Sequence, residues 1–216
     1  LNMFTRLTAL GAKEYLALSF RSMKDDDVKK IKVVPPLLRR DVFRQEATDG
    51  NYIHGYMVNS GFSECVMRWH KDHPETPLRF FWDRWEESPV KKIDDTLSFY
   101  QLDDLEFLRQ MSGCKAYAST AGFESVCEAM YLGKPLMMVP AHIEQECNAF
   151  DAMKSSAGIV DSDFDLSKLL KFAETYKPDE RFKEWVNSAE YMIVNELEGL
   201  ASTAFMPNMY MVEEYI

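Results

Sequence analysis

The middle of this 216-residue chain alternates between short apolar runs and amphipathic stretches of helical length, and this alternation limits the possible folds most strongly. Runs rich in β-branched and aromatic residues predict strands, whereas apolar residues recurring every three or four positions predict helices. Strands that alternate with helices in this way are typical of βαβ units. We therefore predict an α/β fold, in which a parallel sheet over about residues 51–160 is flanked by helices.

The individual elements follow from the same patterns. We predict strands at residues 51–59, 78–82, 96–100, 115–118, 136–139 and 158–160, and helices at 64–71, 103–111, 122–132, 145–155, 165–176 and 179–197. The polar stretch 83–95 and the tail 201–216 receive no element. Two further strands are predicted at 15–20 and 31–34, and Pro35-Pro36 after them indicates a linker.

Charge and hydropathy exclude several classes of function. A net charge of −10 and a pI near 5.0 argue against a nucleic-acid binder or a binder of anionic membranes, because both need a basic face. No apolar run approaches the roughly 18 residues of a membrane span. The four cysteines form no CxxC pair, which favours reduced thiols and a cytoplasmic location.

Ligands of parallel α/β sheets bind at the carboxyl ends of the strands, so the loops there carry the candidate site. Ser119, Thr120 and Gly122 lie between a predicted strand and a predicted helix. Small residues let a ligand approach the backbone, and a helix N-terminus favours a phosphate or diphosphate. The alternative is an ordinary turn in which Ser or Thr caps the helix.

Two further groups follow along the chain. Glu124 and Glu128 share a helix face; Ser125 could reach a phosphate, and Glu128 could accept two hydrogen bonds from a vicinal diol. The alternative is a pair of solvated glutamates. After the next strand, Glu144 and Gln145 could bind sugar hydroxyls, with His142 nearby; taken alone, this segment is a polar loop.

The combination is more specific than its parts. The pattern G-F-x-S-x-x-E-A-x-x-x-G-K-P, an apolar strand ending in Pro, and E-Q-x-x-N-A resemble the nucleotide-sugar half of GT-B glycosyltransferases, of family 1 or similar to family 28. The resemblance is strong over residues 96–160 and fair back to about 51. It implies a Rossmann-like parallel sheet and a nucleoside-diphosphate sugar, by analogy a UDP-sugar, as the donor.

The resemblance also implies a role for each motif residue. Gly122, Phe123 and Ser125 would lie at the donor diphosphate, Glu128 at the ribose hydroxyls, and Glu144 and Gln145 at the transferred sugar, with His142 at phosphate or sugar. Gln101 and Leu102 would read the base, and Asn59 and Gly61 would lie near the diphosphate. Thr120 stands where the muramyl-peptide enzymes have an arginine, so helix dipole and N–H groups alone would meet the phosphate charge.

GT-B enzymes have two such domains with the active site between them. By this resemblance residues 1–40 would be the end of a missing N-terminal domain and a hinge at Val33–Arg40, and residues 41–200 the nucleotide-sugar domain. The helix 179–197 would cross back toward the missing domain. The chain would then be an incomplete, inactive fragment that binds nucleotide, whose catalytic base is unknown and lies in the missing domain. The acceptor would be a glycan, lipid or small molecule, and any peripheral contact with the inner membrane face would come through the missing domain.

No cofactor and no metal are expected. The sequence has no DxD loop suited to Mg²⁺, and His70 and His73 have no evident partner ligands. Asp25–Asp27 and Asp161–Asp165 are better explained as solvated loop charge. Two other functions stay open on the same scaffold: a UDP-sugar 2-epimerase or hydrolase, and a non-catalytic nucleotide-binding module.

Overall fold

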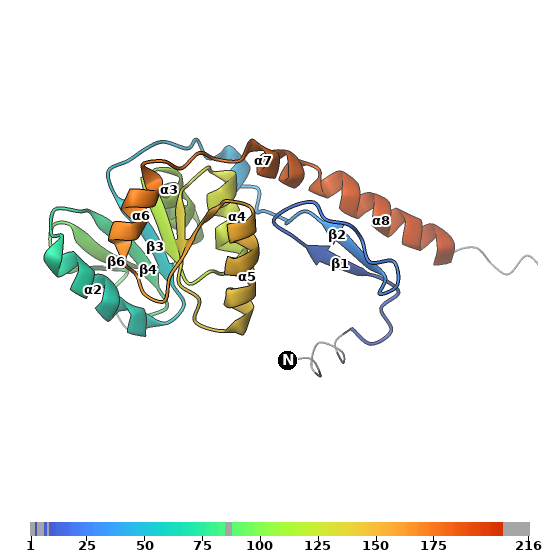
Figure 1. Ribbon diagram of the computed structural model, residues 1–216, viewed down its shortest axis with the longest axis horizontal. Helices are drawn as coiled ribbons and strands as arrows, with labels where there is room; N and C mark the ends of the chain where they lie inside the picture. Colours follow the sequence, from blue (N-terminus) through green and yellow to red (C-terminus); the bar gives the residue numbers. More distant parts are fainter. Residues whose placement is uncertain (1–2, 4–6, 8, 85–87, 205–216) are drawn as a thin grey trace, which may run out of the picture. The chain divides into compact units, whose positions relative to one another are not determined.

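The computed structural model describes residues 3, 7, 9–84 and 88–204, and these fall into two compact units (Figure 1). The larger unit comprises residues 38–183. The smaller one combines the described residues of 1–37 with those from Glu184 onward. The predicted domain boundaries at residues 40 and 200, and a further domain before them, stay predictions.

A seven-stranded sheet forms the centre of the larger unit, in the order β5-β6-β4-β3-β7-β8-β9. Its strands are β3 (Ile53–Met57), β4 (Leu78–Trp82), β5 (Val90–Lys92), β6 (Leu97–Gln101), β7 (Ala116–Ser119), β8 (Leu136–Met138) and β9 (Gly158–Val160). All neighbours pair in parallel except β5, which pairs antiparallel with β6. The predicted α/β fold is confirmed. Strand β5 was missed because its three residues, Val-Lys-Lys, are too short and polar to give a strand signal.

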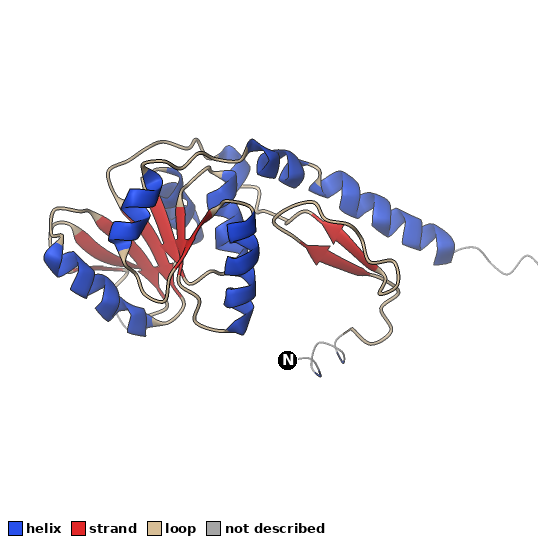
Figure 2. Ribbon diagram, viewed as in Figure 1, coloured by secondary structure: helices blue, strands red, loops and turns tan. Residues whose placement is uncertain are grey.

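Helices cover both faces of this sheet (Figure 2). The α-helices of this unit are α2 (Ser63–Asp72), α3 (Asp104–Ser112), α4 (Phe123–Tyr131), α5 (Ile143–Lys154) and α6 (Leu166–Ala173). Two short 3-10 helices, η1 (Val42–Arg44) and η2 (Ser60–Phe62), precede β3 and α2 in the chain. Helices α2 and α6 lie on one face, and α3, α4 and α5 on the other (Figure 1). This division follows from right-handed crossovers that leave β3 and β7 in opposite directions.

Apolar side chains pack on both faces of the sheet, because successive strand residues point to opposite faces. Phe80 and Trp82 of β4 belong to one core cluster with Leu169 of α6 and with Phe164, which lies just before that helix. A side chain on Gly55, in the neighbouring strand β3, would place its Cβ 2.2 Å from the ring of Phe80, so glycine is required there.

The smaller unit contains two parallel strands, β1 (Tyr15–Leu18) and β2 (Ile31–Val34), which confirm the two strands predicted there. Helix α8 (Ala189–Ala204) packs against β2. The indole N–H of Trp185 donates to the carbonyl oxygen of Ser19 at 2.9 Å.

The single helix predicted at 179–197 is wrong. The segment forms α7 (Glu180–Asn187) and α8, separated at Ser188, whose hydroxyl donates to the carbonyl of Trp185 at 2.7 Å. A serine hydroxyl that bonds the backbone competes with helix hydrogen bonds, which accounts for the break. Helix α8 continues into the unassigned tail as far as residue 204, and residues 205–216 lie outside the described residues. Within the described part of the chain, no helix combines the length and apolar character needed to cross a membrane.

Candidate functional site

The sheet has a topological switch point between β3 and β7. From β3 the chain crosses to β4 on one side, and from β7 it crosses to β8 on the other. In open α/β sheets, ligands bind in the crevice outside the carboxyl ends of the two strands at such a point. The predicted site residues lie at this carboxyl edge: Asn59 and Gly61 after β3; Gln101 and Leu102 at the end of β6; Thr120, Gly122, Phe123, Ser125 and Glu128 after β7; and His142, Glu144 and Gln145 after β8.

The turn between β7 and α4 is buried and conformationally constrained. Ala121 adopts a left-handed backbone with φ of 61°, which a residue with a Cβ rarely does. Its N–H donates to the hydroxyl of Ser119 at 3.2 Å. The Thr120 hydroxyl accepts from the N–H of Val58 at 3.3 Å, which ties this turn to the end of β3. Thr120 is therefore a structural link between the two strands of the switch point.

Helix α4 begins at this turn. Gly122 is its N-cap residue, and with no side chain of its own it leaves the first turn open to another acceptor. The Ser125 hydroxyl donates to the carbonyl oxygen of Gly122 at 3.2 Å. The positive end of the α4 dipole therefore lies at the switch point, where it favours an anion.

The loop after β3 forms the other side of the switch point. The side-chain oxygen of Asn59 accepts from the N–H of Gly61 at 2.8 Å. This local turn precedes η2, and Asn59 and Gly61 are both exposed. Phe62 anchors the loop by packing edge-on against Phe164 of the core, at 5.6 Å between ring centroids.

Glu128, one turn into α4, is only 4% exposed and forms an ion pair. Its Oε1 accepts from Arg39 Nε at 2.6 Å, and its Oε2 accepts from Arg39 Nη2 at 3.0 Å. Burial raises the pKa of Glu128, while the hydrogen bonds from Arg39 lower it. The sequence predicted two free acceptor oxygens here, whereas both are engaged by Arg39.

Arg39 is a residue at this edge that the sequence analysis missed. Its Nη1 lies 3.4 Å from Asp104 Oδ1, and its guanidinium carbon lies 5.9 Å from the ring centroid of Phe107. It was assigned only to the hinge Val33–Arg40, because an ion pair across 89 positions leaves no local pattern. The signal that was available is chemical, since a glutamate on the buried face of a helix needs a cation.

The start of α5 holds the residues predicted to contact the sugar. His142 is the N-cap residue and is exposed, as is Glu144. Gln145 is buried, and its side-chain oxygen accepts from the N–H of Ala141 at 2.8 Å. Asn148, which was not predicted as a site residue, donates to the carbonyl oxygen of Ala121 at 3.2 Å and so fixes α5 against the β7–α4 turn.

The end of β6 holds the predicted base-reading residues. Gln101 is the last residue of this strand, and its side-chain amide donates to the carbonyl oxygen of Arg84 at 3.2 Å. Leu102 follows and is 40% exposed. Asp103 then caps α3 by accepting from the N–H of Glu106 at 2.9 Å. The loop therefore presents an apolar side chain at the edge of the sheet.

Two cavities lined by described residues lie away from the switch point between β3 and β7. One of about 710 Å³ lies at the amino ends of the strands and is lined by Asp49, Lys115 and Lys134, among others. The other, of about 630 Å³, lies beside β9 and α6. At the carboxyl edge, the space next to Glu128 is taken by the side chain of Arg39.

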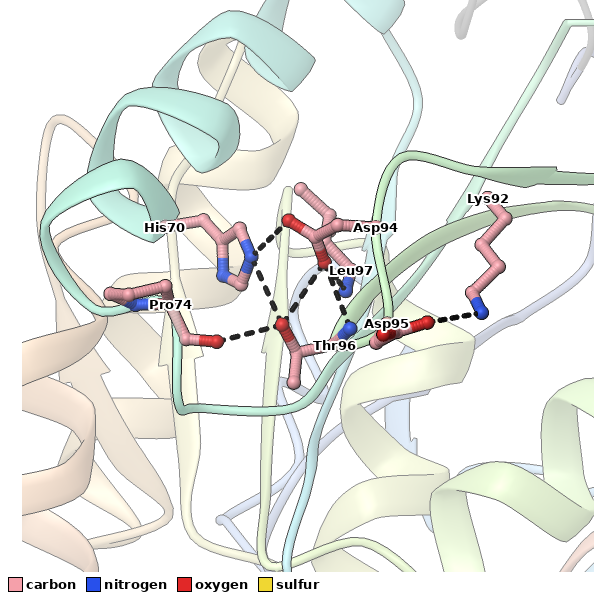
Figure 3. A network of polar contacts seen from close by, with 7 residues as sticks. All are labelled: His70, Pro74, Lys92, Asp94, Asp95, Thr96 and Leu97. Carbon is pink, nitrogen blue, oxygen red and sulfur yellow. Dashed lines mark hydrogen bonds and ion pairs between the residues drawn. The ribbon is translucent and has the colours of Figure 1, made fainter.

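The two histidines considered for metal binding have other partners. His70 Nε2 lies 3.0 Å from Asp94 Oδ2, within a network that includes Thr96 (Figure 3). His73 Nδ1 lies 3.0 Å from the carbonyl oxygen of Trp69, on whose indole its ring stacks. Among the described residues, no three His, Cys, Asp or Glu side chains form a group that could hold a metal ion.

Comparisons with known proteins agree with this topology. The sequence matches the family model described as Glycosyl transferase family 1 over residues 2–176. A search of curated proteins finds no match.

Three solved structures share the fold. The glycotransferase of kitacinnamycin is 14% identical with a TM-score of 0.57, covering 80% of this chain and 50% of its own. UGT89C1 of Arabidopsis thaliana, complexed with UDP-L-rhamnose, is 16% identical with a TM-score of 0.55, covering 83% and 50%. SnogD of Streptomyces nogalater is 11% identical with a TM-score of 0.52, covering 90% and 60%.

At these identities the structural likeness shows the fold alone, and that fold is the GT-B fold predicted from the sequence. The chain spans about half the length of the first two of these structures. The family match covers most of the chain, including every predicted site residue. The chain therefore belongs to glycosyl transferase family 1.

Proposed function

We propose that this chain is the donor-binding half of a metal-independent glycosyltransferase, and that its donor is a UDP-sugar. One observation carries the proposal: α4 begins at the switch point between β3 and β7, with its N-terminus at the carboxyl edge. Two structures of the same fold support the choice of nucleotide, since UGT89C1 is complexed with UDP-L-rhamnose and LpCGTa with UDP, at TM-scores of 0.55 and 0.54. The acceptor in this proposal is a glycan, lipid or small molecule.

In this proposal the donor diphosphate lies against the first turn of α4, between Gly122 and the exposed loop Asn59–Gly61. Negative charge grows on the diphosphate as the glycosidic bond breaks. A helix N-terminus that is already oriented stabilises this charge without reorganisation, and each such donor group contributes a few kcal/mol. The link between Thr120 and Val58 holds the two loops in register.

The remaining residues would recognise the rest of the donor. Glu128 would accept the ribose hydroxyls, and the backbone around Leu102 would read the base. Glu144 is exposed in the first turn of α5, from which it would contact sugar hydroxyls, and His142 is the N-cap residue of the same helix. Gln145 would contribute only through its amide nitrogen, because its oxygen is engaged by Ala141.

The test is titration calorimetry of the purified chain with UDP, UMP and GDP, on the wild type and two variants of Gly122. The backbone at Gly122 has an ordinary φ of −63°, and a Cβ there would make only an ordinary contact, so both variants should fold. Gly122→Asp places a carboxylate where we put the diphosphate, whereas Gly122→Asn is its neutral match. Both residues are good N-caps, so stability should not fall in either.

We expect the wild type to bind UDP more tightly than UMP. Gly122→Asp should lose about tenfold or more in UDP affinity, the factor that corresponds to 1.4 kcal/mol. Gly122→Asn should lose clearly less. Equal UDP affinity in the Asp and Asn variants would show that the diphosphate does not lie at α4, and the proposal would be wrong.

A further inference from the structure

The carboxylate assigned to the ribose is already occupied by another part of the same unit. Both oxygens of Glu128 accept from Arg39, at 2.6 and 3.0 Å, in a two-pronged arrangement. The Glu128 side chain is 5% exposed and that of Arg39 is 32% exposed, so the arginine covers the acid and itself reaches solvent.

The guanidinium imitates the ligand that Glu128 is proposed to bind. It presents two N–H donors side by side to one carboxylate. A vicinal diol presents two O–H donors to the same pair of oxygens. With the carboxylate this deeply covered, the arginine and the diol would need the same position.

The other contacts of Arg39 place it where the nucleoside should lie. Its Nη1 reaches Asp104 at the start of α3, directly after the loop predicted to read the base. Its guanidinium also lies over the ring of Phe107, on the same helix. Arg39 therefore spans the interval from the ribose-binding acid on α4 to the base-reading loop before α3.

Asp104 offers Arg39 an alternative partner when it leaves Glu128. The Asp104 side chain is 84% exposed and lies 3.4 Å from Arg39, a looser pairing than the one with Glu128. An arginine that leaves Glu128 therefore keeps an acidic partner at the surface, and the ribose hydroxyls would satisfy the acid that it leaves.

We propose that Arg39 is an internal competitor of the donor nucleotide, which closes the nucleoside site in the free protein and is displaced when the ribose diol binds Glu128. This inference rests on the proposed function. Because only the open fraction of the protein binds, the apparent affinity for nucleotide is lower than the intrinsic affinity by that fraction. Removing the guanidinium should therefore tighten binding.

The test is calorimetry with two probes, UDP and 2′-deoxy-UDP, on the wild type, Arg39→Met, Arg39→Lys and Arg40→Met. Lysine keeps the charge beside Glu128 and so preserves folding, but it cannot make the two-pronged contact. Arg40 is the exposed neighbour of Arg39, and its substitution controls for the loss of one positive charge.

We expect Arg39→Met to bind UDP about tenfold more tightly than the wild type, with Arg39→Lys between them and Arg40→Met unchanged. The preference for UDP over 2′-deoxy-UDP should also grow in Arg39→Met, because the freed acid then bonds the intact diol without displacing a competitor. If Arg39→Met does not fold, the comparison of Arg39→Lys with the wild type decides.

The two proposals fail in different ways. Failure of the wild type and of every variant to bind UDP would reject the proposed function, and this inference with it. Wild-type binding that is unchanged or weakened in Arg39→Met and Arg39→Lys would overturn the competitor role and leave the proposed function intact.

Discussion

Two carboxylates lie at opposite edges of the central sheet, and they are satisfied in different ways. At the amino edge, Asp94 Oδ1 accepts from the backbone N–H groups of Thr96 and Leu97, both at 2.8 Å (Figure 3). At the carboxyl edge, Glu128 is held by the side chain of Arg39. The backbone bond from Thr96 is the main cause that lowers the pKa of Asp94, whereas burial raises the pKa of Glu128.

The two acids differ in how easily their partners can be replaced. The partners of Asp94 are fixed by the local backbone, whereas the partner of Glu128 is a side chain that another group can displace. The backbone partners of Asp94 lie two and three residues along the chain, so these bonds form whenever the turn forms. The partner of Glu128 is a long, one-third exposed side chain 89 positions away. Such a partner can leave without unfolding the helix, as the proposed displacement of Arg39 by a nucleotide requires.

The largest effect is expected from Arg39→Met on stability. The variant leaves a buried carboxylate without its cation, which costs about 3 kcal/mol of unfolding free energy at pH 7, the low end for breaking a buried pair because Arg39 is partly exposed. Urea unfolding measures it. The control adds Glu128→Gln, in whose background the loss from Arg39→Met should be less than half as large. If Arg39→Met lowers the free energy of unfolding by less than about 1 kcal/mol in the wild-type background, where Glu128 is kept, then Glu128 is not buried as a charge.

Asp94→Ala should cost less, about 2 kcal/mol, because two backbone N–H groups lose their acceptor and His70 loses its partner in a half-exposed turn. Its UDP affinity should equal that of the wild type, since the network lies at the opposite edge of the sheet. Asp94→Asn keeps one oxygen acceptor and should lose less. Weaker UDP binding by the folded Asp94→Ala variant would contradict the view that nucleotide binding depends on the carboxyl edge alone.

The pH dependence should differ in sign between the two acids. Asp94 has a folded pKa below its ordinary value of 3.8, so its contribution is present above that pH and is lost as the pH falls through the folded pKa. Glu128 has a folded pKa above its ordinary value of 4.5, so its contribution is greatest below that pH and declines as the pH rises through the folded pKa. Unfolding at pH 3 to 7 tests this with Asp94→Asn and Glu128→Gln as references. Parallel curves for the two would contradict it.

The sequence predicted those features whose signal is local. The apolar run at β8 and the helical spacing in α3 gave the α/β alternation, and parallel strands then placed the predicted site residues at one edge. The pair Arg39–Glu128 escaped prediction because its members are joined only by the fold. The break at Ser188 was not predicted for another reason. Helical patterns continue on both sides of Ser188, and the hydrogen bond from its hydroxyl to the carbonyl of Trp185 gives no pattern in the sequence.

The smallest effect is expected at two residues with a left-handed backbone conformation, one near each edge of the sheet. Ser156 follows α5 with φ of 55° and is exposed, whereas Ala121 has φ of 61° and is fully buried. Ser156→Gly should raise the free energy of unfolding by about 0.5 kcal/mol, because glycine adopts this conformation without strain and ends helices well. Ala121→Gly should instead lower the free energy of unfolding by about 0.3 kcal/mol, since removing a buried methyl group costs about 0.8 kcal/mol, more than the relief of about 0.5 kcal/mol. Ser156→Ala, which keeps the Cβ, should gain nothing. Urea unfolding measures both variants. A larger gain from Ala121→Gly than from Ser156→Gly would mean that backbone strain at Ala121 outweighs the packing of its methyl group, and that the carboxyl edge holds more backbone strain than the amino edge.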